Sequence, residues 1–193
     1  VTCGGGVDWQ PKRGVADVLE ETDEWRVVRN GAGAVLKWWK HRSGTPEHIE
    51  FDMTSREVWE RDYRPLLVDF DPGRVGDTAA VARSLAHRRE QGKWAAYGSV
   101  FIWEYMRASM GDYTMYMALA TEPDWIHDFC RVYTDLYLKA AEILVAEAGP
   151  PDGVWLSEDL GYRDRLFCRP ETLAELIFPY YTEVVSFYHA HDV

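Results

Sequence analysis

The order of strand-like and helical patterns in the second half of the chain most constrains the fold. A β-prone run at 94–100 leads into a helical segment that Gly111 closes, then a long amphipathic helix at 123–148, a second apolar run at 153–156 and a helix beginning at Pro170. Strands alternating with helices in this way form parallel pairs joined by helical crossovers. The sequence therefore predicts an α/β fold, either a barrel or an open doubly wound sheet.

The long helix is the clearest local signal. Pro123 suits a first helical turn, Asp124 complements the positive end of the helix dipole, and Gly149 ends the helix. Between these residues one apolar stripe recurs at helical spacing, formed by Ile126, Phe129, Tyr133, Leu136, Tyr137, Ala140, Leu144 and Ala148. The stripe predicts a helix with one buried face.

The first half of the chain predicts a hairpin and helices. The run at 15–25 indicates a short helix or turn, and Asn30-Gly31 separates two β-prone runs as in a hairpin. A third extended run follows at 48–53. Helices are expected over 55–67 and from Asp77 to Gln91. At 193 residues the chain is expected to form a single domain.

Charge and hydropathy exclude several classes of partner. The formal net charge of -11 creates a negative field, and the basic residues are interspersed with acids, so we expect no nucleic-acid partner and no membrane surface. No apolar run approaches the length of about 18 residues that a membrane span needs, and no leader opens the chain. A cytoplasmic location is the expectation.

Three cysteines, Cys3, Cys130 and Cys168, are odd in number and lack CxxC spacing. They are expected to be reduced thiols with packing roles rather than a disulfide framework or a zinc site. His189 and His191 stand two apart on a helix and so face nearly opposite sides, which disfavours a shared metal ion.

Two adjacent acids, Glu158 and Asp159, follow the second apolar run directly, with Gly161 just beyond. In parallel α/β folds, ligands bind at the carboxyl ends of the strands, so these acids are predicted to lie at the mouth of a site. The alternative is that they cap the next helix or pair with nearby arginines, which are Arg163, Arg165 and Arg169.

Several aromatic and basic side chains are further candidates. Tyr97 and Tyr162 could line a flat ligand pocket together with Trp103 and Tyr105, or they could be ordinary core residues. A substrate carboxylate could be held by Arg163, Arg165 and Arg169. The alternative is that these arginines simply pair with Asp159, Asp164 or solvent.

Four segments carry a resemblance to a known family. The segment 157–193 resembles a stretch of the uroporphyrinogen decarboxylase superfamily, and three earlier segments, at 29–40, 97–111 and 120–125, resemble its N-terminal hairpin and two later regions in the right order. The matching positions in the last segment are Glu158, Asp159, Leu160, Gly161, Pro170, Glu171, Pro179, Tyr180, His189 and His191.

The resemblance implies a (β/α)8 TIM barrel of roughly twice this length, with an N-terminal β-hairpin and helices. Residues 1–193 would be a single-domain part of it, truncated at both ends, which agrees with a chain that begins at Val1. A partial barrel has open sheet edges and an uncovered interior. It is therefore expected to form a homo-oligomer or to associate with the missing half.

Two enzyme activities follow from the resemblance. The favoured one is zinc-assisted methyl transfer between a corrinoid and a thiol in the full-length parent. The zinc ligands of that branch would follow the counterpart of 189–193, so no metal ligand is predicted within this chain. The first alternative is uroporphyrinogen decarboxylation, but an acidic chain matches a polyanionic substrate poorly. The second is a catalytically inert half-barrel.

Roles for individual residues follow from the favoured activity. Glu158 and Asp159 are the catalytic candidates and would orient the metal-bound group or accept a proton. Tyr162, Arg163 and Tyr97 are the expected substrate-binding residues.

Overall fold

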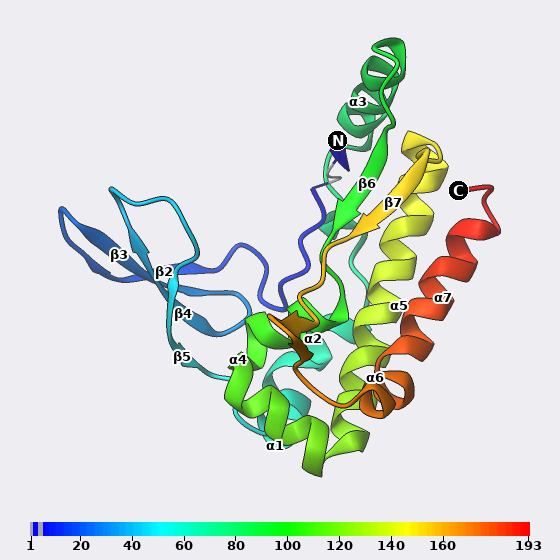
Figure 1. The fold of residues 1–193 in the computed structure, drawn as a ribbon. Coiled ribbons are helices and arrows are strands. Elements are labelled where there is room, and N and C mark those ends of the chain that lie inside the picture. Colours follow the sequence, from blue (N-terminus) through cyan, green and yellow to red (C-terminus); the bar gives the residue numbers. More distant parts are fainter. Residues whose placement is uncertain (1, 4–5) are drawn as a thin grey trace.

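A computed structural model describes residues 2–3 and 6–193 and confirms an α/β chain (Figure 1). Its central element is a parallel sheet of three short strands, β1 (Thr2–Cys3), β6 (Ala96–Ser99) and β7 (Gly153–Leu156), in the order β1-β6-β7. The two runs predicted as strands therefore pair directly and in parallel, Tyr97 opposite Val154. The described residues form no closed barrel.

Helices connect and follow these strands. They are α3 (Thr78–Glu90) between β1 and β6, α4 (Ile102–Thr121) and α5 (Pro123–Ala148) between β6 and β7, and α6 (Pro170–Leu176) and α7 (Phe178–His189) after β7. Packing joins α3 to α5 and α5 to α7. Figure 1 shows α5 and α7 side by side on one flank of the molecule. The helices thus succeed one another in the same order as the strands.

A second, antiparallel sheet projects from this helical body (Figure 1). It contains β2 (Ala16–Glu21), β3 (Trp25–Asn30), β4 (Ala34–Trp39) and β5 (Glu47–Phe51) in sequence order. The helix or turn predicted over 15–25 is wrong, because β2 pairs along β3 with a register shift between Val18 and Glu20. Pairing with a formed neighbour outweighs the weak helical preference of this run.

The helix predicted over 55–67 is present but divided. It comprises α1 (Arg56–Val58), a π-helical turn η1 (Trp59–Tyr63) and α2 (Pro65–Val68). The N–H of Arg64 bonds to the carbonyl of Trp59 within the π-turn. Pro65 has no N–H to continue a regular ladder, so the chain restarts there. A short 3-10 turn, η2 (Pro72–Arg74), leads on towards α3.

The core is aromatic and centres on α5. The predicted apolar stripe of this helix is buried from Ile126 to Leu144, while Ala148 at its end is half-buried. Trp59 packs against Phe129 with ring centroids 4.9 Å apart. The local pattern therefore identified the helix that organises the body.

Two helix breaks follow glycine and proline signals. Gly111 has φ 71° and ψ 164°, so the backbone leaves the helical region there, yet helix resumes and continues to Thr121. Phe51 of β5 lies where a side chain at residue 111 would project. The predicted break at Pro179 is confirmed, because α6 and α7 are separated at Ile177. None of the described helices is both long and apolar enough to cross a membrane.

Candidate functional site

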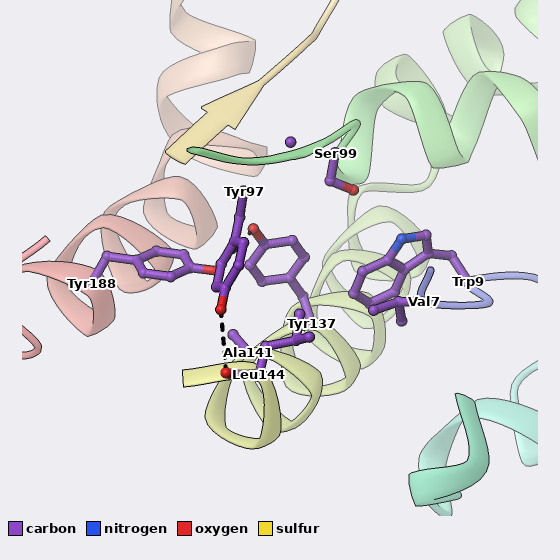
Figure 2. A pocket seen from close by; sticks show the side chains of 9 residues that line it. Val7, Trp9, Tyr97, Ser99, Tyr137, Ala141, Leu144 and Tyr188 are labelled. Carbon is purple, nitrogen blue, oxygen red and sulfur yellow. Dashed lines mark hydrogen bonds between the residues drawn. The ribbon is translucent and has the colours of Figure 1, made fainter. Parts of the chain in front are cut away.

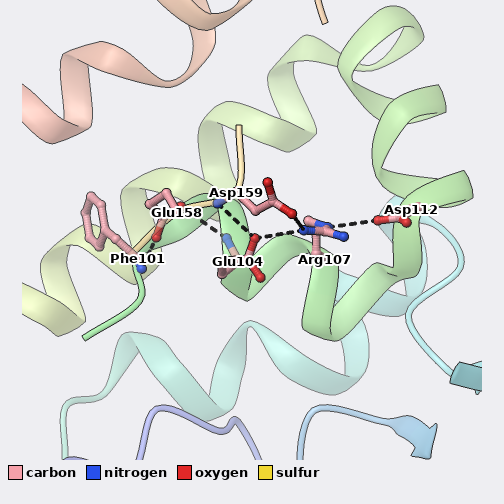
Figure 3. A network of polar contacts seen from close by, with 6 residues as sticks. All are labelled: Phe101, Glu104, Arg107, Asp112, Glu158 and Asp159. Atoms are coloured by element: carbon pink, nitrogen blue, oxygen red, sulfur yellow. Dashed lines mark hydrogen bonds and ion pairs between the residues drawn. The ribbon is translucent and has the colours of Figure 1, made fainter. Parts of the chain in front are cut away.

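Glu158 follows β7 and turns back onto the start of α4 (Figure 3). One carboxylate oxygen accepts the N–H of Phe101, and the other accepts the N–H of Glu104 at 3.2 Å. A carboxylate at a helix N-terminus satisfies N–H groups that have no partner within the helix. Glu158 is therefore a helix cap, although the helix it caps precedes β7 instead of following it.

The Glu158 carboxyl has a pKa close to neutral pH. Burial raises its pKa to about 7, although the two N–H donors and the neighbouring Tyr181 hydroxyl favour the charged form. That hydroxyl is buried and makes no hydrogen bond of normal geometry. A carboxyl with such a pKa can both hold and release a proton at physiological pH.

Asp159 belongs to a network centred on Arg107 (Figure 3). The Arg107 guanidinium lies 3.3 Å from Asp159, 3.0 Å from Glu104 and 2.9 Å from Asp112. Burial lowers the pKa of Arg107, but the bonds to these carboxylates outweigh burial and raise it. Asp159 thus pairs with an arginine of α4, and one guanidinium serves three carboxylates.

A cleft opens beside these acids, between α4 and the antiparallel sheet. A cavity of about 480 Å³ is lined by Val7, Asp8, Trp9, Gln10, Pro11, Asn30, Ala32, Val100, Glu104, Tyr105, Ala108, Ser109 and Tyr133. A second cavity, of about 340 Å³, is lined by Asn30, Leu36, Thr45, His48, Phe51, Glu104, Arg107, Ala108 and Asp159. Because they share Asn30, Glu104 and Ala108, we treat the two as one cleft.

The cleft lies where the parallel strands end. The segment 7–11 follows β1, Val100 and Glu104 follow β6, and Asp159 follows β7. This is the position in which α/β folds place their ligands. The structure therefore brings Asp159 to a cleft mouth, as predicted, while Glu158 supports the wall of the cleft from behind.

The cleft walls are fixed by one arginine and one hairpin loop. Arg74, which is 3% exposed, donates to the carbonyls of Asp8 and Gln10 at 3.0 and 2.8 Å, and also to those of Pro11 and Leu66. The Gly31 N–H donates to the Gln10 side chain at 2.8 Å. A side chain at residue 31 would collide with the Lys12 carbonyl, so the close approach needs glycine.

Tyr97 does not join the acids. It lies on β6, but its side chain points to α5, where its hydroxyl bonds to the Leu144 carbonyl at 3.2 Å (Figure 2). The same hydroxyl also bonds to the Gly149 carbonyl at 2.6 Å. The small cavity beside it, about 30 Å³, is lined by Trp9, Tyr137 and Tyr188 among others. The structure thus favours the core alternative for Tyr97 over a substrate-binding role.

Tyr162 and Arg163 lie on a short exposed hairpin of β8 (Gly161–Tyr162) and β9 (Arg165–Leu166). The Arg163 guanidinium stacks 5.3 Å from the centroid of the Tyr162 ring. Neither residue lines the cleft. A ligand bound in the cleft could therefore contact Tyr162 or Arg163 only if part of it extended beyond the cleft.

Sequence reasoning missed several cleft residues, above all Glu104, Arg107 and Trp9. Glu104 follows the end of β6, so the rule that selected Asp159 would also have selected it. Trp9 follows β1, a strand of two residues that is too short to show any periodic pattern.

No group of three potential metal ligands comes together in the described part of the chain. Cys130 is buried, and burial raises the pKa of its thiol. Burial also raises the pKa of the half-buried Cys168. The side chain of Cys3 lies outside the described residues. The His191 ring contacts the Phe187 carbonyl at 2.8 Å.

Comparison of the chain with protein-family models, with curated proteins and with solved structures finds no match. The cleft and its acids are therefore interpreted from geometry and chemistry.

Proposed function

We propose that this chain is part of a (β/α)8-barrel enzyme of the uroporphyrinogen decarboxylase superfamily, and that the enzyme is methyltransferase-like, moving a methyl group between a corrinoid and a thiol. The observation that carries the proposal is a cleft with acidic walls at the carboxyl ends of three parallel strands. Barrel enzymes build their active sites at this position.

The strand and helix order supports a partial barrel over a doubly wound sheet. Chain order and spatial order agree for β1, β6 and β7, and α3, α5 and α7 pack in the same succession. A doubly wound sheet reverses its strand order and places helices on both faces. A barrel instead winds in one direction and carries its helices outside.

The uncovered side of the sheet supports association with further barrel strands or a second copy. Among the described residues, β7 pairs only with β6, which leaves its other edge without a strand. Val154 and Leu156 line a cavity against α7, whereas Trp155 between them is 60% exposed. Because side chains alternate along a strand, Trp155 points to the face that a closed barrel would bury.

The cleft acids suit the proton that methyl transfer releases. A bound methylcorrinoid would supply the methyl group through cleavage of its cobalt–carbon bond, with the bonding electron pair left on the corrinoid. The thiol sulfur would form the new bond to carbon, and the thiol proton would have to leave. Asp159 and Glu104 line the cleft and can accept that proton, while Glu158 holds the first turn of α4 in place. The described residues do not supply a zinc ligand set.

The two alternatives are less well supported. A decarboxylase of polycarboxylate substrates needs unpaired cations, whereas the arginine lining the cleft, Arg107, is already held by Glu104, Asp112 and Asp159. A catalytically inert half-barrel does not account for a preformed cleft at the strand ends.

Incubation of the full-length parent protein with methylcobalamin, zinc and a small free thiol tests the proposal. We expect thioether formation to match the loss of methylcobalamin absorbance. Asp159→Asn and Glu104→Gln should each slow transfer by about 10²-fold or more, which is typical for loss of a proton acceptor. Asp152→Asn is the control, since this acid lies at the opposite end of β7 and pairs with Arg89.

Transfer no faster than the reaction without protein would contradict methyl transfer and favour the inert half-barrel. Turnover of a porphyrinogen without methyl transfer would favour the decarboxylase.

A further inference from the structure

The larger cavity of the cleft has an aromatic wall. Trp9, Tyr105 and Tyr133 all line it. The ring centroids of Trp9 and Tyr105 are 5.8 Å apart, and those of Tyr105 and Tyr133 are 5.1 Å apart. Three neighbouring aromatic side chains thus line one cavity. Aromatic rings attract cations through the ring quadrupole.

The charges around this cavity have the same preference. The charged side chains that line it, Asp8 and Glu104, are both acids. Arg74 lies behind the wall and is committed to backbone carbonyls, and Arg107 is held by its three carboxylates. The two lining carboxylates therefore leave a negative field in the cavity, which favours cations and repels anions.

The polar groups of the wall are largely engaged within the protein. The Asn30 side-chain oxygen accepts the N–H groups of Ala32 and Ala34, both at 3.0 Å, and Gln10 accepts that of Gly31. The Tyr105 hydroxyl bonds to Ser99 at 3.1 Å. The cavity consequently offers aromatic surface and negative charge more than open hydrogen-bond acceptors. That combination suits a cation with few or no N–H donors.

We infer that this cavity binds a small N-methylated ammonium compound. The volume of about 480 Å³ lies within the range of about 300–1,000 Å³ in which proteins hold small ligands. The inference goes beyond the proposed function, whose substrates are a corrinoid and a thiol, and shares only the cleft with it. Its test requires binding alone and no turnover.

Calorimetric titration with choline and with 3,3-dimethylbutan-1-ol tests the inference. The two compounds have the same shape, but carbon replaces the charged nitrogen in the second. We expect choline to bind about tenfold more tightly, since only the charged compound gains cation–π attraction from the aromatic rings. Equal affinity for the two compounds, or no binding of choline, would overturn the inference.

Matched variants separate loss of the aromatic wall from loss of folding. Trp9→Leu keeps an apolar side chain and should reduce the preference for choline to about threefold or less, whereas Trp9→Phe keeps a ring and should retain most of it. Glu104→Gln should weaken choline binding but leave binding of the alcohol unchanged. Circular dichroism checks that each variant is folded. An unchanged preference in Trp9→Leu would also contradict the inference.

The outcomes of the two experiments are independent. Methyl transfer without a preference for choline would leave the proposed function standing and overturn the inference. A preference for choline without methyl transfer would do the reverse.

Discussion

The helical body and the projecting antiparallel sheet differ in how deeply their large side chains are buried and therefore in what stabilises them. In the body, the indole rings of Trp59, Trp103 and Trp125 are almost completely buried. In the sheet, every residue of β2 is exposed, and Trp38 is 46% exposed. The body is stabilised by removing large apolar surfaces from water. The sheet depends on cross-strand pairs, each of which contributes only tenths of a kcal/mol to about 1 kcal/mol.

The cleft lies where these two regions meet, so its geometry depends on how the sheet is docked. Phe51 of β5 packs against α4 at Gly111, and the loop after β3 packs against the segment 7–11 through Gly31. These contacts fix the position of the weakly stabilised sheet relative to the strongly stabilised body.

The largest expected effect tests the difference in burial. Trp59→Ala should lower the free energy of unfolding by about 3–5 kcal/mol, because it leaves a cavity and removes one of the two hydrogen-bond partners of Asp128. Trp38→Ala on the sheet should change it by about 0.5 kcal/mol or less. Urea unfolding followed by circular dichroism measures both. Similar losses of unfolding free energy in the two variants would contradict the proposed difference between body and sheet.

The next effect concerns the junction. Gly111→Ala should cost about 2–4 kcal/mol, because residue 111 adopts a backbone conformation that only glycine adopts readily and the new methyl group meets Phe51. Gly92→Ala, at φ +66° in open space, should bear only the backbone cost. Adding Phe51→Ala to Gly111→Ala should restore part of the loss. Urea unfolding of these three variants would detect this, and equal losses at residues 92 and 111 would exclude the clash.

The pH dependence of stability tests the cap on α4. Because the pKa of Glu158 is raised from 4.5 to about 7 on folding, the folded protein keeps a proton that the unfolded chain releases in this window. The stabilising contribution is complete below pH 4.5 and is lost as the pH rises to about 7, by about 3 kcal/mol at most. Glu158→Gln stays neutral throughout. The unfolding free energy of the wild type relative to this variant should therefore fall between pH 4.5 and 7. Parallel curves would show that Glu158 does not titrate in this range.

The smallest effect lies within the sheet. The Lys37 ammonium lies 4.1 Å from the Trp25 ring centroid and 4.4 Å from that of Trp39. Lys37→Gln should cost about 0.5–1 kcal/mol and act on the sheet alone. Hydrogen exchange should show faster exchange in β3 and β4 with α5 unaffected. Lys40→Gln, which removes only a surface ion pair with Glu21, is the control and should change exchange less.

The sequence was most informative where structure is local. The helix at 123–148 carries its start, stripe and stop within its own residues, so its bounds agree with the structure. The edge strand β2 carries no such signal, because its conformation depends on pairing with β3. The structure shows an α/β chain with a three-stranded parallel sheet. The barrel is a proposal.

The candidate site was predictable in position but not in orientation. Strand-end logic placed Asp159 at the cleft, yet the direction of Glu158 depends on N–H groups of α4 more than 50 residues earlier. Tyr97 was assigned to the site because its aromatic ring could line a flat ligand pocket. The face it occupies is set by the register of β6 against β7, which no local pattern reveals.

Arg74 has a consequence for how a ligand would enter. Its guanidinium donates hydrogen bonds to three backbone carbonyls of the segment 7–11, those of Asp8, Gln10 and Pro11, and so orders this segment before any ligand is present. A segment that is already ordered need not give up conformational entropy on binding. Capture should therefore proceed in a single kinetic step, with a rate that falls as salt screens the carboxylates, and without a slow rearrangement of the 7–11 wall.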